Sequence, residues 1–251
     1  MKILLTNDDG IYAPGLWALY DRLSGDHTVT VVAPDRERSA VSHGITLNDP
    51  LRAFTVSLNG YRGHAVSGKP ADCVRLGLQE LMTAPPDMVI SGINPGANVG
   101  VNINYSGTVA AAREAVLFGI PAIAVSVQGH DVRHYAGAAR FAEKVTQGVS
   151  KKGLPFGTLL NINLPDLPPD QIRGVRISRQ GISKISDGNY ERRTDPRNRP
   201  YHWLGVEKEN RSEAPDVDGG ALSRNFISVT PIRCDMTDYG LLEELRNWNF
   251  E

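Results

Sequence analysis

The chain has 251 residues, and its 27 lysine and arginine residues nearly balance 28 aspartate and glutamate residues, for a formal net charge of −1. This balance excludes a bulk positive field that would gather nucleic acid, so we expect a small-molecule partner and no stable nucleic-acid complex. Two cysteines give neither a disulfide framework nor a metal-binding pair, the amino terminus lacks a signal peptide, and no apolar run approaches membrane-spanning length. We therefore expect a cytoplasmic protein without membrane contact, folded as a single α/β domain over 1–251.

The first predicted element is a short buried strand that ends in two carboxylates. Residues 3–5 form an unbroken apolar run, typical of a parallel strand buried on both faces, and Asn-Asp-Asp-Gly follows at 7–10. Because ligands bind at the carboxyl ends of strands in open α/β sheets, Asp8 and Asp9 are candidates for metal coordination or proton transfer. The alternative interpretation is a simple turn in which an aspartate caps the next helix.

A second strand and its loop are predicted to lie beside the first. Pro14 opens a helix that ends near Gly25, and a β-branched strand follows at 29–32. Strand, helix and strand in this order open a parallel sheet. The polar loop at 34–44 leaves the second strand at the same edge, so its hydroxyl groups, including that of Ser39, can reach the two aspartates.

The next stretch predicts a hairpin and a helix. Residues 54–58 and 61–65 flank Asn59-Gly60, a strong signal for a two-residue hairpin turn, so the sheet should be mixed. Pro70 then opens a helix in which Cys73 is most simply a small core residue.

A segment with an unusual composition, 91–108, follows a buried strand at 88–90. Its glycines allow close approach of the backbone to a ligand, and its asparagines supply neutral oxygen and amide groups. They are Gly92, Gly96, Gly100, Gly107, Asn94, Asn98, Asn102 and Asn104. Because glycine and asparagine also favour left-handed turns, a convoluted structural loop is the alternative.

A predicted helix start closes this segment. Ser106 is the expected N-cap, and Gly107 and Thr108 begin an alanine-rich helix that runs to Leu117. Unpaired N–H groups and the positive end of the helix dipole favour an anion there, and a phosphate would fit. The alternative is an ordinary capped helix that binds nothing.

The rest of the chain predicts further core elements and one polar arm. The expected strands are 120–127, 159–164, 175–178 and 227–232, and the expected helices are 135–149 and 241–248. From Arg179 to Asn225 apolar residues are sparse, so this stretch cannot fill a core of its own and is interpreted as a projecting hairpin or arm. Its arginines and aromatic residues suggest nucleic-acid contact, but acids accompany them, which favours an oligomer arm or a solvated loop.

The predicted strand ends together form an oxygen-rich set. Such a set suits a hard divalent ion such as Mg²⁺ or Mn²⁺, whereas zinc would prefer histidine or cysteine. A metal beside a helix amino terminus holds and polarises phosphoryl groups, so these residues indicate phosphoester hydrolysis. The sequence has no P-loop, no dinucleotide-binding glycine motif after the first strand and no nucleophile elbow, which argues against a P-loop NTPase, a dinucleotide enzyme and an esterase.

Several longer motifs occur in order along almost the whole chain. They are N-D-D-G at 7–10, A-P-D-R-x-R-S at 33–39, P-A-D-C-V at 70–74, S-G-I-N-x-G-x-N-x-G at 91–100, Y-S-G-T-V at 105–109 and S-V-T-P at 228–231. Jointly they resemble the SurE survival-protein family. The resemblance implies a metal-dependent 5′/3′-nucleotidase acting on nucleoside monophosphates, and a homodimer or homotetramer built by carboxyl-terminal arms. It further implies a three-layer α/β/α fold with a mixed, mainly parallel Rossmann-like sheet and a projecting C-terminal β-hairpin arm at about 179–225.

The resemblance also implies roles for particular residues. One divalent ion per subunit, Mg²⁺ or Mn²⁺, would be held by Asp8, Asp9, Ser39 and Asn94. The phosphate pocket would be lined by Asn98, Ser106, Gly107 and Thr108. Two positions depart from the family pattern: Ala40 stands where glycine usually follows the loop serine, and Lys69 stands where threonine often precedes Pro-Ala-Asp. Neither is a proposed metal ligand, but Lys69 puts the substrate preference or the oligomer contacts in doubt.

The expected mechanism has the metal bind a phosphate oxygen and lower the pKa of a coordinated water. Asp8 or Asp9 would be the catalytic base, and the helix start at Ser106 would stabilise charge on the phosphoryl group. Attack by an aspartate to give an acyl phosphate stays open. The alternative from another class is a metal-dependent nucleotide-binding or sensing protein without turnover.

Overall fold

The computed structural model describes residues 1–58, 60–183, 190–205 and 214–250. In these ranges one mixed sheet has the strand order β3-β4-β2-β1-β5-β6-β7-β11-β8. Its strands are β1 (Lys2–Thr6), β2 (Thr28–Pro34), β3 (Ala53–Leu58), β4 (Tyr61–Val66), β5 (Met88–Pro95), β6 (Ala122–Val127), β7 (Thr158–Leu164), β8 (Val175–Ile177) and β11 (Ile227–Arg233). The strands from β4 to β7 are parallel, whereas β3 pairs antiparallel with β4 and β11 pairs antiparallel with β7.

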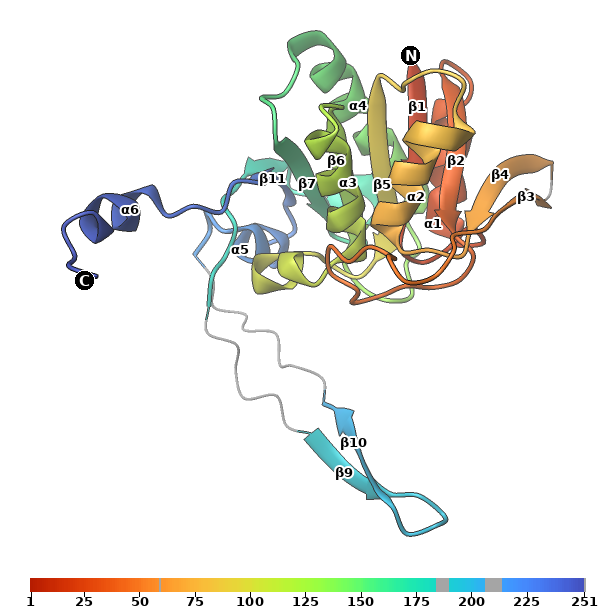
Figure 1. The fold of residues 1–251 in the computed structure, drawn as a ribbon. Coiled ribbons are helices and arrows are strands. Elements are labelled where there is room, and N and C mark those ends of the chain that lie inside the picture. Colours follow the sequence, from red (N-terminus) through yellow and green to blue (C-terminus); the bar gives the residue numbers. More distant parts are fainter. Residues whose placement is uncertain (59, 184–189, 206–213, 251) are drawn as a thin grey trace.

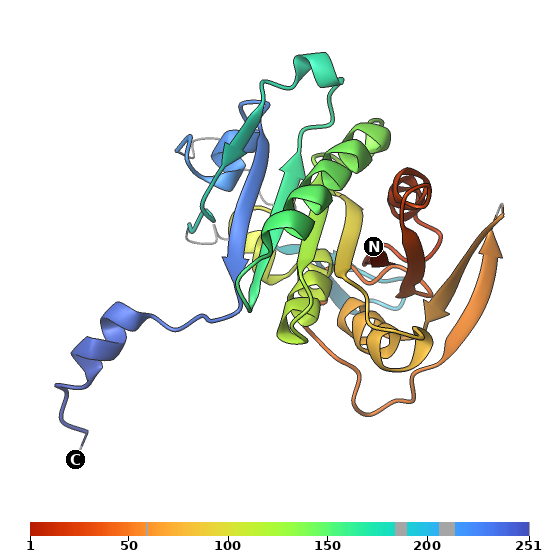
Figure 2. The same ribbon diagram turned by 90° about the horizontal axis from the view of Figure 1, so that it is seen from above.

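Helices cover both faces of this sheet and make three layers (Figure 2). One face packs on α1 (Pro14–Leu23) and α4 (Tyr135–Lys152), and the other packs on α2 (Pro70–Leu76) and α3 (Gly107–Leu117). Alternate side chains of β1 serve the two cores, because Ile3 and Leu5 join the first and Leu4 joins the second. The three-layer α/β/α prediction is therefore confirmed, and so is the buried core position of Cys73.

Two predicted elements differ in detail. The helix from Pro70 stops being α-helical at Leu76 and ends in a π-helical turn, η1 (Gly77–Leu81). The predicted hairpin turn has Gly60 in the left-handed region, with φ of 87°, while Asn59 lies outside the described residues. The antiparallel pairing of β3 with β4 confirms the hairpin itself.

The polar stretch 179–225 contains a hairpin that is separate from the main sheet (Figure 1). Every residue of its strands, β9 (Tyr190–Thr194) and β10 (Pro200–Leu204), is exposed. The predicted arm is too long, because α5 (Asp218–Leu222) is buried against β11. Residues 184–189 and 206–213 of this stretch lie outside the described residues.

The carboxyl-terminal helix α6 (Tyr239–Leu245) extends away from the body of the molecule (Figures 1 and 2). The helix expected at 241–248 is thus present but begins and ends earlier, and none of its residues is buried. Within the described ranges, no helix combines the length and the apolarity needed to cross a bilayer.

Candidate functional site

The two aspartates lie in a tight turn at the carboxyl end of β1. The Asn7 side chain closes this turn, since its Nδ2 donates to the Gly10 carbonyl at 3.0 Å and its Oδ1 accepts the Gly10 N–H at 3.2 Å. Gly10 has φ of 98°, and a Cβ there would lie 3.0 Å from the Arg36 backbone, so the turn needs glycine. The alternative that an aspartate caps the next helix is wrong, because the N-cap of α1 is Ala13.

Asp8 is held against the amino terminus of α3. The Thr108 hydroxyl donates to Asp8 Oδ1 at 2.5 Å, and a Cβ on Gly107 would lie only 2.8 Å from Asp8 Cβ. Ser106 caps the helix as predicted, since its Oγ accepts the Val109 N–H at 3.1 Å. Burial raises the pKa of Asp8, and hydrogen bonds from the Thr108 side chain and from the Gly107 and Thr108 backbone partly oppose that rise.

Asp9 is the aspartate whose charged form has less support from its surroundings. Burial, followed by the charges of Asp8 and Glu37, raises the pKa of Asp9 to about 8. Among the described residues its buried Oδ2 has no hydrogen-bond partner. A buried carboxylate oxygen without a hydrogen-bond donor raises the free energy of the folded state. A bound proton or cation at this atom would lower it.

The loop that carries Ser39 crosses the same edge. The Arg38 N–H donates to the Asp8 carbonyl at 2.7 Å, and the Ser42 hydroxyl donates to the Asn104 carbonyl at 2.7 Å. The loop thus links the turn after β1 to the segment before α3. Ser39 itself is exposed, and its hydroxyl donates to Glu37 Oε1 at 2.6 Å.

The two asparagines of the 91–108 segment that were predicted to be in the site, Asn94 and Asn98, differ in their surroundings. Asn94 lies in β5, three residues after the residue that pairs with the last residue of β1, and its Nδ2 donates to the Gly96 carbonyl at 2.7 Å. Asn98 is buried instead, and its Nδ2 donates to Ser126 Oγ at 2.8 Å. Asn98 also accepts, through its carbonyl, amide hydrogens from Asn161 and Asn163. Its contacts are those of a structural anchor, and its role in binding phosphate stays a prediction.

The donor set fits a hard divalent cation. Asp8, Asp9, Ser39 and Asn94 offer oxygen atoms only, which suits Mg²⁺ or Mn²⁺. Asp9 Oδ2 has no hydrogen-bond partner among the described residues and lies beside the Asp8 carboxylate. A cation bound there would stabilise the charged forms of both aspartates. In the described part of the chain no group of three or more His, Cys, Asp or Glu side chains converges, so the two aspartates would be the charged ligands.

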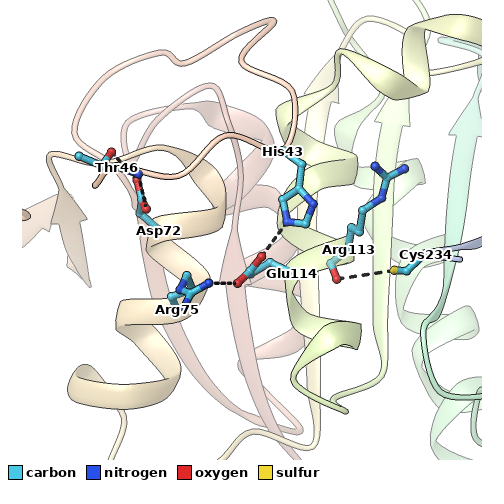
Figure 3. Close-up of polar contacts among 7 residues, drawn as sticks. All are labelled: His43, Thr46, Asp72, Arg75, Arg113, Glu114 and Cys234. Carbon is cyan, nitrogen blue, oxygen red and sulfur yellow. Dashed lines mark hydrogen bonds and ion pairs between the residues drawn. The ribbon is translucent and has the colours of Figure 1, made fainter. Parts of the chain in front are cut away.

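A buried glutamate that the sequence gave no reason to single out anchors the serine loop. Glu114 of α3 accepts from Arg75 Nη1 at 3.0 Å and lies 2.7 Å from His43 Nε2 (Figure 3). Glu114 is 4% exposed, so its contact with His43 attaches the loop that carries Ser39 to a buried side chain of α3. Sequence reasoning missed this contact because it joins residues that are distant in the chain.

Tyr135, the first residue of α4, is a second unpredicted neighbour of the site. Burial raises the pKa of Tyr135, and the charge of Asp9 raises it further. The Tyr135 ring packs so closely on α1 that a Cβ on Gly15 would lie 3.0 Å from it.

This arrangement defines a Rossmann-like α/β protein with an acidic, oxygen-lined centre beside a helix amino terminus. The family model described as "Survival protein SurE" matches residues 3–187. The chain is 58% identical to the 5′-nucleotidase SurE of Desulfatibacillum aliphaticivorans, over 100% of this chain and 99% of the relative. It is 51% identical to the 5′-nucleotidase SurE of Syntrophobacter fumaroxidans, over 99% and 100% of the two chains. The crystal structure of the SurE protein from Aquifex aeolicus superposes with a TM-score of 0.85 at 35% identity, over 98% of each chain. The chain belongs to the SurE family.

Proposed function

We propose that this chain is a metal-dependent phosphomonoesterase that hydrolyses nucleoside 5′- and 3′-monophosphates to nucleoside and phosphate. The relatives named 5′-nucleotidase SurE support the nucleotidase activity, since they match over nearly the full chain. The structural observation that carries the proposal is the contact between Asp8 and the start of α3, with the unpartnered Asp9 beside it.

Asp8, Asp9, Ser39 and Asn94 would hold one Mg²⁺ or Mn²⁺ ion. When bound, this ion would neutralise charge on the phosphoryl group and activate a water molecule. The ion would also favour approach of the substrate, because it offsets the negative charge that the two aspartates present to a phosphate near the start of α3.

The start of α3 would bind the phosphoryl oxygens. Gly107 and Thr108 are in the first turn, where backbone N–H groups have no partner within the helix. In this structure those two N–H groups also form hydrogen bonds with Asp8. The aspartate and the phosphate would therefore both bind at the start of α3. Ser106 keeps its hydroxyl on Val109 and so fixes the direction of the helix start.

Asp9 is the better candidate to hold or move a proton. The carboxylate of Asp8 is tied by the Thr108 hydroxyl, whereas Asp9 Oδ2 has no partner among the described residues. A general base must reach the proton that it removes, and an untied oxygen is free to do so.

Phosphate release separates this proposal from the non-catalytic alternative. The assay uses 5′-AMP, 3′-AMP and the other nucleoside monophosphates with Mg²⁺, with Mn²⁺ and with EDTA. We expect turnover that needs the metal. Tight nucleotide binding with no phosphate release in any of these conditions would favour the sensing protein instead.

We also propose a cytoplasmic homodimer or homotetramer. The hairpin β9–β10 exposes Tyr190, Trp203 and Leu204, and α6 precedes Trp248 and Phe250, which are 59% and 77% exposed. Large apolar side chains on projecting elements are typical of surfaces that a second subunit covers. Light scattering on two deletions, Tyr190–Leu204 replaced by a Gly-Ser link and a truncation after Thr237, tests this. We expect at least one of them to lower the assembly state, and an unchanged oligomer in both would overturn the assignment.

A further inference from the structure

A polar cavity of about 450 Å³ lies next to the loop that carries Ser39. Its walls come from residues 36 and 38 and from the segments 45–50 and 67–69. Three cations, Arg36, Arg38 and Lys69, line it together with a single acid, Asp49. The excess of positive charge makes this a site for an anion.

The cavity is at the same edge of the sheet as the two aspartates. Arg36 and Arg38 follow β2, and 67–69 follows β4, which pairs with β2 in parallel. Since β2 also pairs with β1, the cavity lies one to two strand spacings, roughly 5–10 Å, from the end of β1. A single substrate can therefore span the two places.

Contacts with Asp72 hold part of the wall in place before any ligand binds. Asp72 accepts the Thr46 hydroxyl at 2.7 Å (Figure 3) and the Lys69 N–H at 2.9 Å, which ties two of the lining segments to α2. Gly68 packs against the same residue, because a Cβ there would lie 2.7 Å from Asp72 Cβ. A preformed site binds with a smaller loss of entropy.

The cations keep donors available for a ligand. Arg38 donates one Nη2 hydrogen to the Ser67 carbonyl and lies 3.6 Å from Asp35, but within the described residues its Nε has no acceptor. Lys69 Nζ donates to the Ile45 carbonyl at 3.1 Å, and an ammonium group has two more hydrogens. Among the described residues Lys69 has no ion pair, and the only ion pair of Arg38 is the long one to Asp35, outside the cavity lining.

We propose that this cavity binds a second phosphate of the substrate, so that the chain prefers nucleotides with two separate phosphoryl groups, such as nucleoside 3′,5′-bisphosphates, over monophosphates. The proposal rests on the proposed function. The described residues that line the cavity include no aromatic side chain, so they offer a nucleobase no ring on which to stack. The two phosphates of such a substrate are separated by one ribose, a span of the order just given. Lys69 would set this preference.

The chemical step is the one proposed above. A water oxygen forms a bond to phosphorus, the ester P–O bond breaks, and the released nucleoside oxygen takes a proton while water loses one. The second phosphate keeps its ester bond and serves only for binding, so no further reactant is needed.

Steady-state kinetics on adenosine 3′,5′-bisphosphate and 5′-AMP test the proposal. We expect KM for the bisphosphate to be about tenfold lower, the change that 1.4 kcal/mol produces. Lys69→Thr and Arg36→Ala should each remove most of that difference while affecting 5′-AMP much less. Lys151→Thr, which removes the same charge from the exposed end of α4, is the matched control and should preserve the difference.

The outcomes separate this inference from the proposed function. Hydrolysis of 5′-AMP with equal KM values for both nucleotides, or with the same response in Lys69→Thr and Lys151→Thr, would overturn the second phosphate site and leave the nucleotidase proposal intact. If neither nucleotide is hydrolysed, the nucleotidase proposal fails, and calorimetric titration of the same two nucleotides decides the inference. A tighter Kd for the bisphosphate that Lys69→Thr abolishes would support the site, and equal Kd values would overturn it.

Discussion

Replacing Gly107 with alanine should damage the site more than the fold. The new Cβ would lie 2.8 Å from Asp8 Cβ, 2.9 Å from Asp8 Oδ2 and 3.1 Å from Pro70 Cγ. An ordinary contact needs about 3.5–4.0 Å, so Asp8 or the start of α3 must move by roughly 1 Å. Overpacking of this kind costs about 1–3 kcal/mol of stability, and a misplacement of about 1 Å can lower a rate about 100-fold.

The assay for this variant compares two quantities. Urea unfolding gives the free energy of unfolding, and phosphate release from 5′-AMP gives kcat/KM. Gly148→Ala is the control, since a Cβ at Gly148 of α4 meets nothing within 4 Å and should stabilise the protein by about 0.5–1 kcal/mol with no change in rate. Wild-type kcat/KM in Gly107→Ala would refute the claim that Asp8 must sit tightly against the α3 start.

Three further predictions concern buried carboxylates. Because the pKa of Asp9 is raised to about 8, the metal-free fold binds more protons than the unfolded chain between about pH 4 and 8, and its stability falls as pH rises through that window. Asp9→Asn should therefore raise Tm in EDTA at pH 8 by about 2–4 °C or more, and should change Tm less at pH 5. Equal Tm shifts at the two pH values would contradict the electrostatic cause. Glu114→Ala should lower the free energy of unfolding in urea by about 1–3 kcal/mol, because it leaves Arg75 and His43 without their buried partner. A loss below about 0.5 kcal/mol, that of an ordinary surface change, would show that these two ion pairs do not stabilise the fold. Asp218→Ala should cost about 2–4 kcal/mol, because fully buried Asp218 accepts three backbone N–H groups; unchanged thermal unfolding would count against this accounting.

The sequence predicted local features well where one short segment determines the structure. The turn at 7–10, the hairpin around Gly60 and the N-cap Ser106 each depend on residues that are neighbours in the chain. Their backbone preferences are set by side-chain oxygens and by glycine, which a sequence shows directly.

Features that depend on distant contacts could not be predicted in this way. The position of β11 between β7 and β8 follows from pairing across the sheet, and periodicity carries no such information. The contact of His43 with Glu114 joins residues 71 positions apart. The polar stretch 179–225 contains few apolar residues, and the burial of α5 within it was not predicted. That burial depends on contacts with β11, which the local composition does not show.

The most direct test of the central claim is phosphate release from 5′-AMP by Asp8→Asn and Asp9→Asn in the presence of Mn²⁺. Both variants keep the size of the side chain and remove one charge, so circular dichroism should show a native fold. Loss of a metal ligand or of a general base should lower kcat by about 10²–10⁴-fold. A folded Asp8→Asn and a folded Asp9→Asn that both release phosphate at the wild-type rate would contradict the assignment of the chemistry to this edge of the sheet.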